Sequence, residues 1–209
     1  MVIAIDGPSG VGKTTVSRLV AGRLGWPALD TGALYRAVTL AVLRAGLDPA
    51  DGGAITALLP SLVVGFEEGA VFLDGEEVSD AVRAPHVTEA VSAVSARTEV
   101  RRALVPLQRR WVEEHGGSAV VEGRDIGTVV FPDAEVKVFL TARPEVRAAR
   151  RARQQGSSLG ETAGDLARRD RADSTRETSP LRPAEDAIPI ETSELNAQQV
   201  ADRVLALVR

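Results

Sequence analysis

The stretch GPSGVGKTT, Gly7 to Thr15, directly follows a short apolar run at residues 2–5. Gly7, Gly12, Lys13 and Thr14 match the pattern G-x-x-x-x-G-K-[ST], in which a strand leads through a glycine-rich loop into a helix. After Lys13, apolar residues recur at helical spacing: Val16, Leu19, Val20 and Leu24. The stretch therefore predicts a strand, a tight loop and a helix N-terminus, in that order.

Such a loop binds phosphate, because unpaired backbone N–H groups and the positive end of the helix dipole face it. Glycines let the backbone approach phosphate oxygens without a Cβ in the way. Lys13 is expected to reach the β- and γ-phosphates, and the Thr14 hydroxyl is expected to ligate Mg²⁺. The predicted ATP-binding residues form one continuous segment: Gly7, Pro8, Ser9, Gly10, Val11, Gly12, Lys13, Thr14 and Thr15. The alternative is a glycine-rich turn that binds nothing.

Composition limits the classes of protein that remain. The 209 residues suit one domain, or one core with a small insertion, and the net charge of −4 disfavours binding to a nucleic-acid polymer. The chain has no cysteine, which excludes disulfides and thiolate metal sites. The start lacks the layout of a signal peptide, and no apolar run approaches the roughly 18 residues of a membrane span. We expect a cytoplasmic monomer whose partners are small nucleotides.

Apolar runs alternate with helical stretches along the chain. Strands are predicted at residues 2–6, 28–30, 119–122, 136–141 and 187–191. This alternation is typical of the α/β class, a parallel sheet with helices on both faces. The segment 62–79 departs from it: turn signals at Glu68-Gly69 and Asp74-Gly75 separate short strand-like pieces, which predicts a three-stranded antiparallel insert.

The segment 143–176 contains nine arginines, with Gly156, Ser157, Ser158 and Gly160 in its middle. It predicts two helices joined by a flexible tip. A solvated charged face is one interpretation. A lid is the other, because phosphoryl transfer requires cations around the moving group and a cover that excludes water.

Two further patterns concern the phosphate acceptor. On a helix, Thr31 and Tyr35 share one face, with Arg36 adjacent. The strand at 119–122 ends in Glu122-Gly123-Arg124-Asp125, at the edge where parallel sheets bind ligands. Arg124 is suited to a bidentate phosphate contact, whereas Asp125 either binds ligand or caps the following turn.

A third pattern lies in the second arginine-rich helix. Arg169, Asp173 and Arg176 are expected to share one helical face. They form either a ligand-binding set or a structural salt-bridge ladder.

These motifs give the chain a resemblance to the bacterial cytidylate kinase family of nucleoside-monophosphate (NMP) kinases. GPSGVGKTT, DTGALYR, the insert, EGRDIGTVVFPDA and RRDRADSTR stand in the family's order over essentially the whole chain. The resemblance implies a P-loop NMP-kinase fold: a five-stranded parallel sheet flanked by helices, a small antiparallel insert and an arginine-rich lid. It implies Mg²⁺-dependent transfer of the ATP γ-phosphate to CMP or dCMP. The implied division is a core at 1–30, 100–150 and 177–209, an NMP-binding region at 31–99 and a lid at 151–176.

The resemblance also assigns roles residue by residue. The CMP site is lined by Thr31, where the family often has serine, and by Tyr35 and Arg36. The CMP phosphate is held by Arg36, Arg124 and Arg176, which with Lys13 form the catalytic set. The cytosine is read by Ser92, Arg101 and Asp125. The ribose hydroxyls are bound by Arg169 and Asp173.

Reading of one base by both Ser92 and Arg101 sets a geometric condition. They are nine residues apart, so on one straight helix they would point to opposite sides. The helix must therefore break between them, at residues 97–99, where Thr98 is suited to cap a new start.

Other functions also begin with a phosphate-binding loop. A GTP-driven switch would require Asn-Lys-x-Asp, but the single asparagine, Asn196, is followed by Ala197. A nucleotide-binding regulator without turnover is disfavoured by the intact Lys13, Thr14 and arginines. A kinase of another monophosphate or small metabolite stays open. No dedicated base is expected, since a phosphate oxygen is already a nucleophile.

Overall fold

The computed structural model describes residues 1–156 and 158–208. Within these ranges the chain forms two compact units. Unit 1 comprises Met1–Ala28 and His115–Arg209, and unit 2 comprises Leu29–Glu114.

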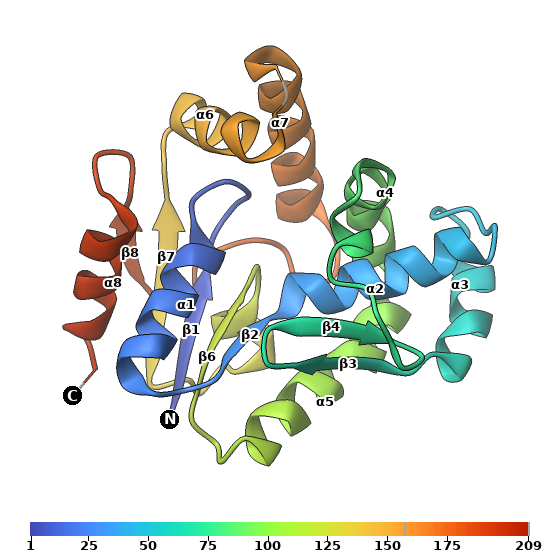
Figure 1. Cartoon of the computed structure of the whole chain (residues 1–209), viewed down its shortest axis with the longest axis horizontal. Helices are drawn as coiled ribbons and strands as arrows, with labels where there is room; N and C mark the ends of the chain where they lie inside the picture. Colours follow the sequence, from blue (N-terminus) through green and yellow to red (C-terminus); the bar gives the residue numbers. More distant parts are fainter. Residues whose placement is uncertain (157, 209) are drawn as a thin grey trace. The chain divides into compact units, whose positions relative to one another are not determined.

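The main sheet has five strands within the described residues, in the order β2-β6-β1-β7-β8 (Figure 1). Their bounds are β1 Val2–Asp6, β2 Ala28–Asp30, β6 Ala119–Gly123, β7 Val136–Thr141 and β8 Ile188–Glu191. β1 pairs in parallel with both β6 and β7, and β7 pairs in parallel with β8. The central position of β1 places the loop that follows it at the middle of the sheet's carboxyl edge.

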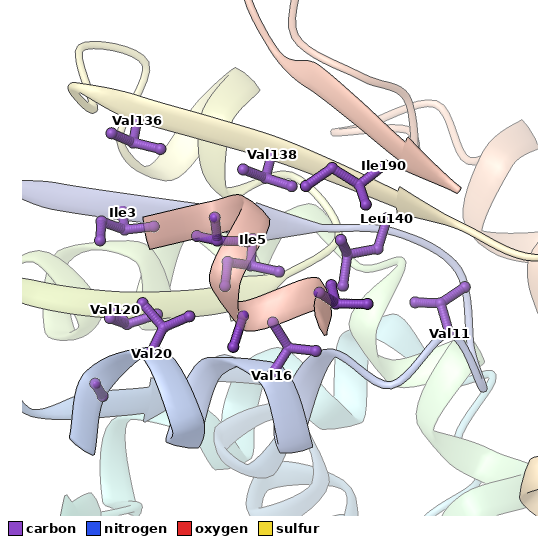
Figure 2. Packing of buried hydrophobic residues seen from close by; sticks show 14 residues of the cluster. Ile3, Ile5, Val11, Val16, Val20, Val120, Val136, Val138, Leu140 and Ile190 are labelled. Atoms are coloured by element: carbon purple, nitrogen blue, oxygen red, sulfur yellow. The ribbon is translucent and has the colours of Figure 1, made fainter. Parts of the chain in front are cut away.

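Helices of unit 1 pack on this sheet and on each other. They are α1 Lys13–Leu24, α6 Pro144–Gln155, α7 Leu159–Thr175 and α8 Ala197–Leu205, with a short π-helical segment, η3 Ile126–Val130. α1 packs against α8 and β6, and α6 packs against α7, both coloured orange in Figure 1. Figure 2 shows Val16 and Val20 of α1 directed toward the strands, where they share a buried cluster with Ile3 and Ile5. This apolar core holds the phosphate-loop helix against β1.

Unit 2 is built around α2 Thr31–Arg44, which packs against α4 Pro85–Ser95. An antiparallel sheet of β3 Val64–Glu67, β4 Ala70–Leu73 and β5 Glu76–Glu77 also belongs to it. The remaining elements are α3 Gly52–Leu58, η1 Leu59–Ser61, η2 Ala81–Arg83 and α5 Thr98–Glu114. Trp111 of α5 donates its indole N–H to the Phe66 carbonyl at 2.6 Å and meets that ring edge-on. The insert is thereby fixed to α5.

The predicted class, insert and helix pair are confirmed, with shifts at some ends. β6 extends one residue further, to Gly123. β8 begins at Ile188, because the Ala187 N–H bonds to Ala184 in a turn. The predicted helix break is also present: α4 ends at Ser95 and α5 begins at Thr98. Thr98 is the first helical residue rather than the one before it. Ser157, part of the predicted lid tip, lies outside the described residues.

Candidate functional site

The segment Gly7 to Thr15 forms a loop that runs close to backbone of the same unit. Gly7 has φ +149°, and a Cβ there would lie 2.4 Å from the Leu140 carbonyl oxygen of β7. Gly10 has φ +80°, and a Cβ would lie 3.0 Å from the Arg147 carbonyl oxygen of α6. Both positions therefore require glycine, for backbone conformation and for space.

Lys13 is the first residue of α1 and is buried. Its ammonium group donates to the carbonyl oxygens of Gly7 at 2.8 Å and Pro8 at 2.9 Å, which holds the charge inside the loop. Gly12, the N-cap of α1, is left-handed, and Thr14 and Thr15 continue the first turn. A cation and a helix N-terminus therefore occupy the same loop, which favours an anion.

Two buried carboxylates lie at or near the carboxyl ends of β1 and β6. Asp6 ends β1 and accepts the backbone N–H groups of Ile126 at 2.9 Å and Gly127 at 2.8 Å. Burial raises the pKa of Asp6 from 3.8 to about 6, despite these hydrogen bonds. Glu122 of β6 accepts the Ser17 hydroxyl of α1 at 3.4 Å.

Arg124 follows β6 and contacts both the loop and α7. Its Nε donates to Asp173 Oδ2 at 2.9 Å, and its Nη2 donates to Ser9 Oγ at 2.8 Å. Burial alone lowers the pKa of Arg124, but the charge and hydrogen bond of Asp173, with nearby Asp170 and Glu122, outweigh it and raise the pKa. Arg124 is thus a fixed cation beside the phosphate loop.

The two other predicted arginines of unit 1 lie near this group. Arg176 Nη2 is 3.7 Å from Asp125 Oδ1, and both side chains are only 5% exposed. Burial and the neighbouring Arg124 lower the pKa of Arg169 to about 10, which leaves it charged at neutral pH. Asp173, Arg169 and Arg176 are therefore brought close to Arg124 and Asp125. The set comprises three partly buried arginines and two buried carboxylates.

The structure differs from two of the sequence-based predictions. Arg176 does not share a helical face with Arg169 and Asp173, because α7 ends at Thr175 and Arg176 is extended, with φ −64° and ψ 142°. This turn of the chain directs Arg176 to Asp125. The Asp125 side chain does not cap the following segment either; its backbone carbonyl accepts the N–H groups of Val129 and Val130, the last two residues of that segment.

The helices α6 and α7 contact the loop through residues that the sequence analysis did not single out. Arg147 of α6 donates to the Ser9 carbonyl at 3.2 Å and to Asp170 of α7. Asp170 in turn accepts the Ser9 N–H at 3.2 Å. Arg150 donates to Thr192, whose hydroxyl lies 3.3 Å from the Val11 carbonyl. The only signal in the sequence was the arginine-rich composition of the segment.

In unit 2, α2 carries three predicted acceptor-site residues. Thr31 and Tyr35 are buried on its first turns, 3% and 7% exposed. Arg36 Nη1 donates to Thr88 Oγ1 at 2.8 Å and to the Val82 carbonyl at 3.1 Å. Thr88, which fixes Arg36, carried no signal in the sequence because its role depends on how α4 packs against α2.

The break between α4 and α5 returns Arg101 to the end of α4. Arg101 is 3% exposed, and its Nη1 donates to the Ser95 carbonyl at 3.3 Å. The Ser95 hydroxyl bonds to the carbonyl of Ser92, three residues earlier. The Arg101 guanidinium also lies 5.2 Å from the centre of the Tyr35 ring. Arg101 is therefore held within one helical turn of Ser92 and against Tyr35.

Known proteins support one family. The family model for cytidylate kinase matches residues 3–209. Proteins called cytidylate kinase from Rhodococcus opacus and Geobacter sulfurreducens are 51% and 46% identical. Both alignments cover 100% of this chain, and they cover 94% and 93% of those proteins.

Solved structures share the fold. An uncharacterised protein from Eubacterium ventriosum aligns over 100% of this chain and 97% of its own, with TM-score 0.58 and 12% identity. A Thermus thermophilus protein aligns over 100% and 98%, with TM-score 0.51 and 21% identity. The full-length match at about half identity decides the assignment, and the chain belongs to the cytidylate kinase family.

Proposed function

We propose that this protein transfers the γ-phosphate of ATP to CMP or dCMP, giving ADP and CDP or dCDP. One observation carries the proposal: Arg124 contacts the phosphate loop through Ser9 and the second lid helix through Asp173. A cation so placed serves a reaction in which phosphate passes from a donor in the loop to an acceptor beside it. A protein that only bound ATP would not require it.

The chemistry calls for alignment and charge neutralisation rather than a base. The loop N–H groups and Lys13 bind the β- and γ-phosphates. Arg36, Arg124 and Arg176 hold the CMP phosphate and offset the charge that spreads over the transferred group. Because a CMP phosphate oxygen is already a nucleophile, the remaining work is to place it in line with the γ-phosphorus.

In this proposal the nucleoside is recognised by polar groups of complementary pattern. Cytosine offers an amino donor beside two acceptors, which suits the Asp125 carboxylate with the Ser92 hydroxyl and the Arg101 guanidinium. Arg169 and Asp173 bind the ribose hydroxyls. The region 31–99 is the NMP-binding region, 151–176 is the lid, and 1–30, 100–150 and 177–209 form the core.

Mg²⁺ fits the residues present when it arrives with ATP. Among residues 1–156 and 158–208, no group of three His, Cys, Asp or Glu side chains could hold a metal. Mg²⁺ bound to nucleotides commonly takes phosphate oxygens, waters and one or two protein oxygens. The half-buried Thr14 hydroxyl in the first turn of α1 would supply one such oxygen. The ion would neutralise phosphate charge.

No helix in the described part of the chain is long and apolar enough to cross a membrane. A cytoplasmic monomer that acts on free nucleotides completes the proposal. Size-exclusion chromatography with light scattering tests the monomer, for which a mass near 22 kDa is expected.

The test is a coupled assay of ADP formation with CMP, dCMP, UMP, AMP and shikimate as acceptors. CMP and dCMP should give the highest kcat/KM, and EDTA should abolish turnover. A higher kcat/KM with another acceptor would refute the assignment.

The chain offers a matched pair of lysine variants, since Lys13 and Lys137 are its only lysines. Lys13→Ala should lower kcat at least a hundredfold with an unchanged circular dichroism spectrum. Lys137→Ala, which removes an ion pair between a largely buried lysine side chain and the exposed Asp186 outside the proposed site, should retain activity. Activity of Lys13→Ala within threefold of wild type would contradict the proposed donor site.

A further inference from the structure

Ser9, the third residue of the phosphate loop, has every polar atom bonded to a different residue. It is 7% exposed. Its N–H donates to Asp170 at 3.2 Å, and its carbonyl accepts Arg147 at 3.2 Å. Its hydroxyl accepts Arg124 Nη2 at 2.8 Å. The backbone of Ser9 is therefore fixed by the lid helices, and its side chain is turned to Arg124.

The contacts of Arg124 show what the hydroxyl does. A guanidinium has five N–H donors in one plane. Within the described residues, Nε bonds to Asp173, Nη1 to the Gly123 carbonyl at 3.4 Å, and Nη2 to Ser9. One N–H on each terminal nitrogen remains available for a phosphate. Asp173 and Ser9 thus anchor two of the three guanidinium nitrogens, which restricts rotation of the group.

We propose that the Ser9 hydroxyl is a positioning group for phosphoryl transfer. Its hydrogen bond fixes the position of the Arg124 guanidinium relative to the phosphate loop. The inference deepens the proposed function and rests on it. Loop residues of this kind usually bind ATP through their backbone N–H groups, but the Ser9 N–H is bonded to Asp170 and its hydroxyl to an acceptor-side arginine. Ser9 thus acts on the acceptor side of the reaction through Arg124.

Loss of the Ser9 hydroxyl is expected to affect ATP binding and phosphoryl transfer differently. Loss of the hydroxyl leaves the loop backbone and Lys13 in place, so ATP binding should change little. Arg124 keeps its hydrogen bond to Asp173 but loses the one to Ser9, so it should hold the transferred group less well. A hydrogen bond to a charged group contributes roughly one to two powers of ten to an equilibrium. Ser9→Ala should therefore lower kcat about tenfold, with the KM for ATP within twofold.

A double-mutant cycle tests whether Ser9 acts through Arg124. Single-turnover rates would be measured for wild type, Ser9→Ala, Arg124→Ala and the double variant, with Ser174→Ala as a control. Ser174 is an exposed serine of α7 whose hydroxyl bonds, among the described residues, only to the Arg171 carbonyl, and its loss should leave the rate unchanged. In the Arg124→Ala background, Ser9→Ala should change the rate less than twofold. The same tenfold loss in both backgrounds would overturn the proposal.

A second readout does not depend on turnover. In an arginine-selective ¹⁵N NMR spectrum, the two terminal nitrogens of Arg124 should give separate signals in wild type, because Ser9 and Asp173 restrict rotation. They should merge in Ser9→Ala and stay separate in Ser174→Ala; the signals are assigned by their loss in Arg124→Ala. Separate signals in Ser9→Ala would refute the proposal. If CMP proves not to be the acceptor, the proposed function fails, whereas the Ser9 inference is decided by these spectra.

Discussion

The buried Asp6 predicts an unusual pH dependence of stability. The pKa of this carboxyl is raised from 3.8 to about 6, chiefly by burial, while hydrogen bonds from Gly127 and Ile126 limit the rise. The folded state therefore binds the Asp6 proton more tightly than the unfolded state does. The resulting stabilisation is fully present below about pH 4 and is lost as pH rises through about 6. Each pKa unit corresponds to about 1.36 kcal/mol, so ionisation of Asp6 costs roughly 3 kcal/mol of folding free energy.

The assay is urea unfolding of wild type and Asp6→Asn at a series of pH values from 4 to 8. Asparagine has a similar shape but cannot ionise, and the other titrating groups are common to both proteins. The free energy of unfolding of Asp6→Asn is lowered by a constant amount at every pH, because its amide accepts hydrogen bonds at one oxygen where the carboxylate accepts at two. Its stability relative to wild type should nonetheless rise by about 3 kcal/mol between pH 4 and 8.

The exposed Asp186 provides a control of opposite sign. Its hydrogen bond to Lys137 lowers the pKa of Asp186, so the stabilisation it provides is lost as pH falls. Asp186→Asn should accordingly lose stability relative to wild type only as pH rises toward about 4, and the difference should stay nearly constant from pH 4 to 8. The result for Asp6→Asn could also refute the burial argument. It would do so if the stability difference from wild type stayed constant within 0.5 kcal/mol (about a third of one pKa unit) from pH 4 to 8.

Three further predictions concern the loop, the base and the lid. Gly7→Ala should abolish measurable ATP binding in calorimetry, because its methyl group would meet the Leu140 carbonyl at 2.4 Å; affinity within threefold of wild type would contradict this. Asp125→Ala should reduce the ratio of kcat/KM for CMP over UMP more than tenfold with little change in the KM for ATP, since uracil presents an acceptor where cytosine presents a donor. An unchanged ratio would show that other residues read the base. Amide hydrogen exchange in α6 and α7 should slow when a non-hydrolysable ATP analogue and CMP are added together, and identical exchange would remove the lid assignment.

Local patterns were enough to place most of the fold. The loop glycines, the apolar spacing after Lys13 and the turn pairs at Glu68-Gly69 and Asp74-Gly75 each describe backbone that neighbouring residues control, and those elements formed as predicted. The break between α4 and α5 was predicted from the shared role that the family resemblance implies for Ser92 and Arg101, combined with helical geometry. The sequence-derived roles of the site residues stay predictions, because they concern ligands rather than local backbone.

The tertiary structure alone decided the partners of the charged groups. Ser9 bonds to Arg124, 115 residues away, and Arg176 leaves its helix to reach Asp125. The pKa of Asp6 depends on how deeply packing buries it and on two N–H groups more than 100 residues further along the chain. Periodicity reports the face on which a side chain lies, but not which distant group packs opposite it. The sequence by itself therefore determined the elements and the backbone course of the loop, and packing determined which side chains hold the arginines in place.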